Sequence, residues 1–123
     1  MQESGEMYLE TILILGAGGT PVRSIDVAEK MCFSRPSVSK AMTRLKADAC
    51  IRIDEGGLIT LTDKGLEIAE KIYERHRVLS ELLIRLGVDE ETALRDACKM
   101  EHDISDASFI AIKRSMENRK ELS

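Results

Sequence analysis

Apolar side chains recur at helical spacing in three successive segments of the N-terminal part of the chain. We expect helices at about residues 4–15, 23–31 and 36–47, separated by breaks that contain glycine or proline. Ser24 is placed to act as the N-cap of the second helix. The third helix has a stripe that we expect to be buried, which consists of Val38, Met42 and Leu45.

Residues 51–61 alternate apolar and polar side chains on both sides of Gly56 and Gly57. Two alternating runs around a Gly-Gly turn predict a β-hairpin. Three helices followed by a hairpin are the element order of a winged helix-turn-helix, whose third helix enters the major groove of DNA. We therefore expect a winged helix-turn-helix DNA-binding domain in residues 1–63.

Three further helical patterns occupy the rest of the chain. The segment that begins at Thr62 caps a helix that should run to about residue 86 and end at Gly87, and Asp89 caps a helix that should run to about residue 103. A last amphipathic helix is expected at about residues 106–117. Its apolar stripe should pack against a second subunit rather than within the monomer, and it consists of Phe109, Ile112 and Met116. The fold class is mainly α, with an all-helical domain at residues 64–123.

The charge distribution changes the picture of an acidic protein. The net charge is −4, yet residues 21–53 hold seven basic and only three acidic side chains. Because this positive segment coincides with the polar face of the third helix, we expect it to bind DNA through phosphates and base edges. A winged helix used only for protein contacts is the alternative. The residues expected to contact DNA are Arg23, Ser34, Arg35, Pro36, Ser37, Ser39, Lys40, Thr43 and Arg44.

The apolar runs and the cysteines indicate a cytoplasmic protein. No apolar run approaches the roughly 20 residues that span a bilayer, so no membrane partner is expected. Cys32, Cys50 and Cys98 are widely spaced and form no CxxC motif. We therefore expect reduced thiols rather than a disulfide framework.

Candidate metal ligands cluster in the segment 96–102. Cys98, Glu101 and His102 are spaced i, i+3 and i+4, so on a helix they project from one face. A thiolate, a carboxylate and an imidazole within one turn are suited to a transition metal. His76 falls on the apolar stripe of the preceding helix. Such a histidine is usually a core residue with a polar partner, but it is also a candidate ligand.

Five motifs in chain order carry a resemblance to a known family. They are residues 6–12 (EMYLETI), 34–39 (SRPSVS), 61–65 (LTDKG), 75–77 (RHR) and 98–102 (CKMEH). With them, the chain resembles the diphtheria-toxin-repressor family of metal-dependent transcription regulators, which includes iron-dependent and manganese-dependent repressors. The resemblance implies a homodimer, not an enzyme, that binds palindromic double-stranded operator DNA near metal-homeostasis genes, with Fe(II) or Mn(II) as corepressor.

The resemblance also implies a ligand set. The residues that match the primary site of the iron branch are Met7, Cys98, Glu101 and His102. Glu10 and His76 match ligands of the manganese branch, so the chain is a hybrid. Because Met7 and Cys98 bring sulfur, we expect Fe(II) in preference to Mn(II), with Co(II), Ni(II) or Zn(II) as surrogates. Whether the site holds one ion or two stays open.

Several positions depart from the family pattern. Ser80 and Leu94 stand where the iron branch has a Glu and a second His, so its ancillary site should be missing or built differently. Ala49 replaces the Gly that usually precedes the wing. The chain has no room for the SH3-like domain of the iron branch, and in length it resembles the short branch or a truncated protein.

The expected mechanism is a population shift, in which an ion held by both halves of the chain fixes their relative placement. Two other classes of function compete with it. Cys98 could be the sensor of a regulator that responds to redox state or to a small molecule. Cys98 and His102 could also be the nucleophile and base of an enzyme, but no oxyanion donor pattern accompanies them.

Overall fold

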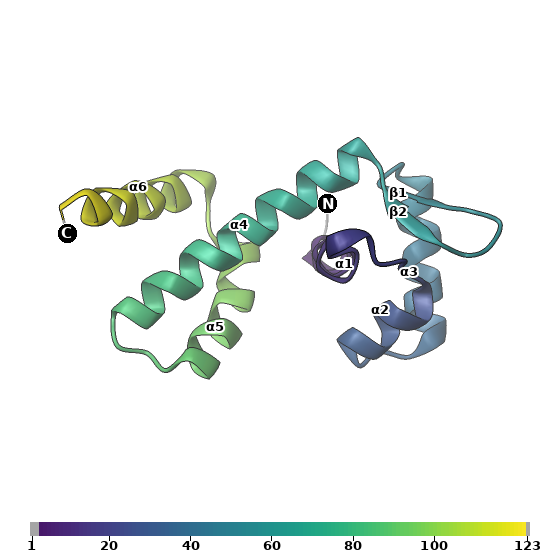
Figure 1. Cartoon of the computed structure of the whole chain (residues 1–123), viewed down its shortest axis with the longest axis horizontal. Helices are drawn as coiled ribbons and strands as arrows, with labels where there is room; N and C mark the ends of the chain where they lie inside the picture. The colour runs from purple at the N-terminus through teal and green to yellow at the C-terminus, as the bar shows by residue number, and fades with distance from the viewer. Residues whose placement is uncertain (1–2, 123) are drawn as a thin grey trace. The chain divides into compact units, whose positions relative to one another are not determined.

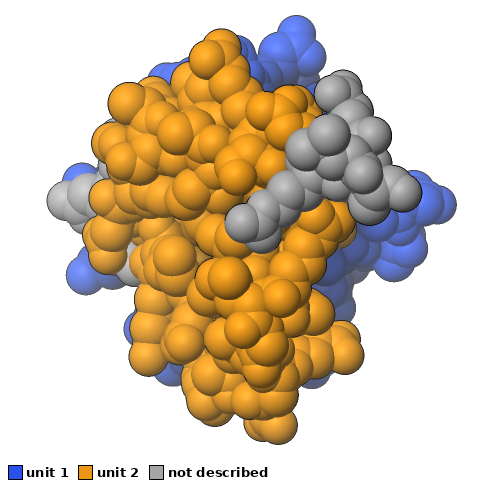
Figure 2. Space-filling model, turned by 90° about the vertical axis from the view of Figure 1, so that its left-hand side faces the viewer, with its two compact units in different colours: residues 1–71 blue, residues 72–123 orange. Residues whose placement is uncertain are grey.

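The computed structural model describes residues 3–122 and shows six α-helices, a 3-10 turn and one two-stranded sheet within that range (Figure 1). The elements are α1 (Glu3–Leu15), η1 (Ala17–Gly19), α2 (Ser24–Met31), α3 (Arg35–Ala47), β1 (Ile51–Ile53), β2 (Ile59–Leu61), α4 (Asp63–Arg85), α5 (Glu90–Asp103) and α6 (Asp106–Leu122). Residues 1–71 and 72–123 form two compact units, coloured blue and orange in Figure 2, and α4 passes through both. In the described range, no helix is both long enough and apolar enough to cross a bilayer.

The helix-turn-helix of the first unit follows the predicted pattern. Val38, Met42 and Leu45 on α3 are all buried and pack with apolar residues of α1 and α2. The Ser34 side chain caps α3 by accepting a hydrogen bond from the Ser37 N–H at 3.3 Å, and Pro36 occupies the first turn. The expectation for Ser24 is wrong, because Arg23 is the N-cap of α2.

The N-cap lies one residue earlier than expected because of a contact in the first turn of α2. The Arg23 N–H donates to the Asp26 carboxylate at 2.8 Å, so an acidic side chain from inside the helix satisfies the free backbone donor.

The wing is an antiparallel hairpin in which Ile51 pairs with Leu61, and Ile53 with Ile59. Ile51 and Ile59 are buried in the core of the first unit, whereas Arg52 faces outward opposite Thr60. The hairpin is also attached to the segment before α2, because the Ile59 N–H donates to the Val22 carbonyl at 2.8 Å. The wing therefore has a fixed place beside the helix-turn-helix.

The start of α4 closes over the turn that links α3 to β1. Thr62 caps α4 as predicted, since its Oγ1 accepts a hydrogen bond from the Gly65 N–H at 3.1 Å. The same Oγ1 donates to the Ala49 carbonyl at 2.7 Å, and the Lys64 Nζ donates to the Asp48 carbonyl at 2.9 Å. Ala49 has a φ of 62°, in the left-handed region where glycine is usual.

The second unit contains the rest of α4 together with α5 and α6. Asp89 caps α5 as predicted, with its carboxylate accepting from the Thr92 N–H at 3.0 Å. Ala93 and Ala97 are fully buried, and side chains of this size allow neighbouring helices to approach closely. The apolar pattern of residues 62–86 suggests that Leu86 ends the buried stripe of this helix, but α4 ends at Arg85 and Leu86 is 65% exposed.

The last helix corrects two further expectations. It continues to Leu122 rather than ending near residue 117. Phe109 and Met116 are 7% and 5% exposed in the single chain, so the monomer itself buries them and the expected packing against a second subunit is wrong for both. Ile112 is half-buried.

Candidate metal centre

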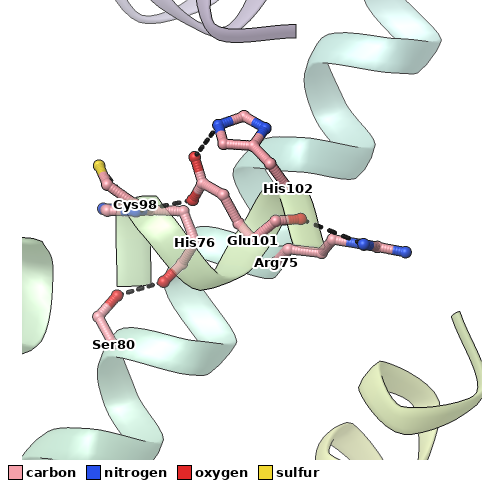
Figure 3. A network of polar contacts seen from close by, with 6 residues as sticks. All are labelled: Arg75, His76, Ser80, Cys98, Glu101 and His102. Carbon is pink, nitrogen blue, oxygen red and sulfur yellow. Dashed lines mark hydrogen bonds and ion pairs between the residues drawn. The ribbon is translucent and has the colours of Figure 1, made fainter. Parts of the chain in front are cut away.

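Four candidate ligands lie together in the second unit. His76 projects from α4, while Cys98, Glu101 and His102 project from the last two turns of α5, as Figure 3 shows. The spacing of the three α5 residues places them along one side of the helix, as expected.

Three donor atoms form a compact group. The His76 Nδ1 lies 3.0 Å from Glu101 Oε2 and 3.8 Å from the Cys98 Sγ, and all three atoms lie within 4.8 Å of one another. Ligands bonded to one ion at about 2.0 to 2.3 Å are themselves about 3 to 4 Å apart. Both distances from the His76 Nδ1 fall in that range, so the nitrogen, the sulfur and the oxygen could hold one divalent transition-metal ion.

Glu101 is the central residue of the group. Its side chain is only 1% exposed, and its two oxygens face different histidines. While Oε2 contacts His76, Oε1 lies 3.4 Å from the His102 Nε2. Cys98 is exposed and His102 has a buried side chain, so the group has one open and one closed side.

The charge state of His76 follows from these contacts. Hydrogen bonding to Cys98 and to Glu101 raises the pKa of His76 from 6.5 to about 10, although burial acts in the opposite direction. In the metal-free protein at neutral pH, His76 therefore holds a proton between the sulfur and the carboxylate. A metal ion would have to displace that proton in order to bind.

The structure brings together two residues that the resemblance assigns to different branches. Cys98 was expected from the iron branch and His76 from the manganese branch, and the two side chains are direct neighbours. Ser80 and Leu94 supply neither a carboxylate nor an imidazole: the Ser80 hydroxyl donates to the His76 carbonyl, and Leu94 is 40% exposed. Among the described side chains, His76, Cys98 and Glu101 form the one group of three with metal-ligand geometry.

Met7 and Glu10 lie on α1, in the first unit. They are three residues apart and therefore share one face of that helix, with Met7 half-buried and Glu10 buried. Their role as ligands stays a prediction.

The residues expected to contact DNA are all exposed. Arg35, Lys40 and Arg44 carry the positive charge of the outer face of α3. Arg23 is different, because its guanidinium donates to the Gly56 carbonyl at the tip of the wing. That contact holds the wing turn against the start of α2.

Two basic residues that were not expected from the sequence also lie at the candidate sites. Arg52 faces outward from the wing, and the alternation of the strand could have identified it as a candidate phosphate contact. Arg75 is buried beside Glu101 in Figure 3, and the helical pattern held no signal for such a long-range contact.

Two family models match the chain, one in its N-terminal part and one in its C-terminal part. Residues 1–53 match the family model of the iron dependent repressor, N-terminal DNA binding domain. Residues 62–121 match the model of the iron dependent repressor, metal binding and dimerisation domain.

Similar proteins include regulators from archaea and bacteria. An uncharacterized HTH-type transcriptional regulator of Methanocaldococcus jannaschii is 33% identical over 123 residues, covering 98% of each chain. The transcriptional regulator MntR of Escherichia coli is 33% identical, covering 86% of this chain and 68% of that protein. The iron-dependent repressor IdeR of Mycobacterium tuberculosis is 34% identical, covering 85% of this chain and 46% of that protein.

Solved structures agree with this grouping. The manganese regulator SloR superposes with a TM-score of 0.84 at 26% identity, and the metal-dependent transcriptional regulator MtsR with 0.86 at 28%. Each comparison covers 95% of this chain but 55% of the other, so the chain spans about half the length of these two proteins. The chain belongs to the iron-dependent repressor family of metal-dependent transcriptional regulators, which is the diphtheria-toxin-repressor family indicated by its motifs.

Proposed function

We propose that this chain is a cytoplasmic repressor that binds palindromic operator DNA as a homodimer when a divalent metal ion is bound. In this proposal the site prefers Fe(II) to Mn(II). The observation that carries the proposal is the group formed by His76, Cys98 and Glu101 in a chain that also contains a winged helix-turn-helix. Its family consists of transcriptional regulators, so the chain is a regulator and not an enzyme.

The proposed ligands follow from donor chemistry and from the family motifs. His76 Nδ1, Cys98 Sγ and a Glu101 oxygen hold the ion on the exposed side of the group. His102 contacts the other oxygen of Glu101 and is proposed as a further ligand, on the buried side of the group. In this proposal Met7 and Glu10 complete the set, on the evidence of the α1 motif.

The preference for Fe(II) rests on sulfur. Mn(II) favours oxygen ligands, whereas a thiolate with an imidazole suits Fe(II), Co(II), Ni(II) and Zn(II) better. The Cys98 Sγ is 3.8 Å from His76 Nδ1, close enough for both atoms to bind one ion.

Metal-dependent DNA binding then follows as a population shift. Ligands from both halves of the chain, gathered on one ion, favour the conformation in which their relative placement is fixed. A gain of about 100-fold in DNA affinity requires only about 2.7 kcal/mol of such preference. In a dimer, that conformation sets the two α3 helices at the spacing of successive major grooves.

The outer face of α3 supplies the DNA contacts in this proposal. Arg35, Lys40 and Arg44 neutralise phosphates or reach guanine, while the exposed hydroxyl groups bond phosphates or base edges. The Thr43 Oγ1 already donates to the Ser39 carbonyl at 3.0 Å, so the Thr43 oxygen remains free to accept a hydrogen bond from a base.

The test combines DNA selection with ligand substitution. Operator fragments are selected from random double-stranded DNA with metal-loaded wild-type protein and are then used in anaerobic gel shifts with and without Fe(II). We expect Cys98→Ala with His102→Ala to abolish the Fe(II)-dependent shift while leaving a folded dimer. Cys32→Ala is the matched control, because Cys32 is also exposed but belongs to the first unit. Full metal-stimulated binding by the double variant would contradict the proposal.

The same experiment separates the metal switch from a redox regulator. A sensor thiol at Cys98 predicts DNA binding that responds to oxidant and is indifferent to chelator. A metal site predicts that EDTA releases the DNA and that Fe(II) restores binding.

A further inference from the structure

Arg75 is a buried cation placed directly before His76 on α4. Its side chain is 7% exposed, and its guanidinium carbon lies 5.5 Å from the centre of the Phe109 ring. The guanidinium Nη1 donates to the Glu101 carbonyl at 3.1 Å and to the Ile104 carbonyl at 2.7 Å. Its Nη2 forms an ion pair with Asp106.

These partners mark the junction between α5 and α6. Ile104 is the C-cap of α5, Glu101 lies in its last turn, and Asp106 is the first residue of α6. Carbonyl groups at the end of a helix have no partner within the helix, and a positive charge beside them is favourable. Arg75 therefore fixes the end of α5 through the carbonyl groups and the start of α6 through the carboxylate.

Glu101 links this junction to the metal ligands. Its carboxylate contacts His76, and its main-chain carbonyl accepts from Arg75, so neighbouring residues of α4 hold the same residue of α5 at two points. Rotation or sliding of α5 against α4 would break both contacts together. The orientation of Glu101 and His102 is therefore tied to the position of the Arg75 guanidinium.

Stability alone is a weak reason to bury this arginine. Replacing a buried ion pair with an apolar side chain of similar volume is often neutral or stabilising. The planar guanidinium of Arg75 instead fixes the relative positions of the two carbonyls and the carboxylate that accept its hydrogen bonds.

We propose that Arg75 is a positioning residue of the metal site, which sets the affinity and the coordination geometry of the bound ion by holding the end of α5. This inference rests on the proposed function, because it assumes that His76, Cys98, Glu101 and His102 bind the ion. Partners that orient metal ligands typically change affinity by about 10- to 100-fold when they are removed.

The test uses Co(II) as a spectroscopic probe with wild-type protein and four variants, of which Cys98→Ala tests the proposed function itself. Arg75→Met keeps the aliphatic volume and removes every donor, while Arg75→Lys keeps a cation without the planar guanidinium. The matched control is Arg85→Met, which removes an exposed arginine of the same helix that pairs with Glu81. The readouts are the dissociation constant for Co(II), the d–d absorption bands and the thiolate-to-Co(II) charge-transfer band, all recorded well below the unfolding temperature.

We expect Arg75→Met to weaken Co(II) binding by about 10- to 100-fold and to alter the d–d bands. Arg75→Lys should fall between Arg75→Met and the wild type, and Arg85→Met should match the wild type. If the Arg75 variants unfold at lower temperature but bind Co(II) with wild-type affinity and spectrum, Arg75 is merely structural and the inference is wrong. If Arg75→Met does not fold, the affinity and spectrum of Arg75→Lys decide in the same way.

Failure of the proposed function has a different signature. In that case Cys98→Ala would bind Co(II) with the same affinity as the wild type, and the charge-transfer band would be absent from every protein. Loss of binding in Cys98→Ala with no change in the Arg75 variants would overturn the inference on Arg75 alone.

Discussion

Gly65 is a position where one added methyl group should damage the DNA-binding unit. A Cβ atom built on Gly65 would lie 2.0 Å from the Cys50 carbonyl oxygen and 2.9 Å from its carbonyl carbon. A carbon and a carbonyl oxygen approach no closer than about 3.3 Å. Gly65→Ala must therefore move the start of α4 away from the α3–β1 turn by more than an ångström.

That movement breaks the contacts through which α4 holds the turn. The Thr62 N–H donates to the Cys50 carbonyl at 3.0 Å, and the Thr62 Oγ1 donates to the Ala49 carbonyl at 2.7 Å. Losing two such bonds costs about 1 to 3 kcal/mol, and overpacking costs about 1 to 3 kcal/mol more. The better helix propensity of alanine offsets about 1 kcal/mol. We expect a net loss of about 3 kcal/mol in the free energy of unfolding.

Urea unfolding followed by circular dichroism measures this loss, and Gly56→Ala is the matched control. A Cβ at Gly56 would have the Asp54 Oδ1 at 3.4 Å as its nearest neighbour, which is an ordinary contact, so that variant should stay within about 1 kcal/mol of the wild type. If Gly65→Ala is as stable as Gly56→Ala, α4 does not approach the turn this closely and the reasoning is refuted.

Three further substitutions address the turn, the histidine and the metal. Ala49→Gly should stabilise the protein by up to about 1 kcal/mol, because relief of a left-handed φ outweighs the added freedom of the unfolded chain; unchanged or lower stability in urea unfolding would argue against strain at this residue. In the metal-free protein the pKa of His76 is raised to about 10. The protonated side chain should therefore increase the free energy of unfolding relative to His76→Gln fully below pH 6.5, and this gain should disappear as the pH rises to 10. A pH-independent difference in unfolding free energy would contradict this. Cys98→Glu replaces sulfur with oxygen and should raise the affinity for Mn(II) relative to Co(II) in calorimetric titration, whereas an unchanged ratio would mean that Cys98 does not select the metal.

Local chemistry made part of the fold predictable from sequence. Thr62 and Asp89 cap their helices as expected, because a short polar side chain before an apolar pattern satisfies backbone donors within its own turn. Ser24 was the wrong choice, because the carboxylate of Asp26 reaches back to the Arg23 N–H and moves the cap by one residue.

Long-range packing was harder to predict. The periodicity of α6 identifies an apolar stripe but does not say whether the same chain or a second subunit covers it, and here Phe109 and Met116 are buried by their own chain. Helical spacing likewise placed Cys98, Glu101 and His102 on one face of α5. The pairing of Cys98 with His76 depends on how α4 and α5 meet, which a one-dimensional pattern does not contain.

The two-sided contact of Glu101 determines how the stoichiometry of the site would appear in solution. Each oxygen of this carboxylate already faces its own histidine. Two cations on opposite sides would therefore share Glu101 as a bridging ligand, and occupation of one side would change the affinity of the other. Titration would then saturate at two ions per chain, whereas a single-ion site would saturate at one.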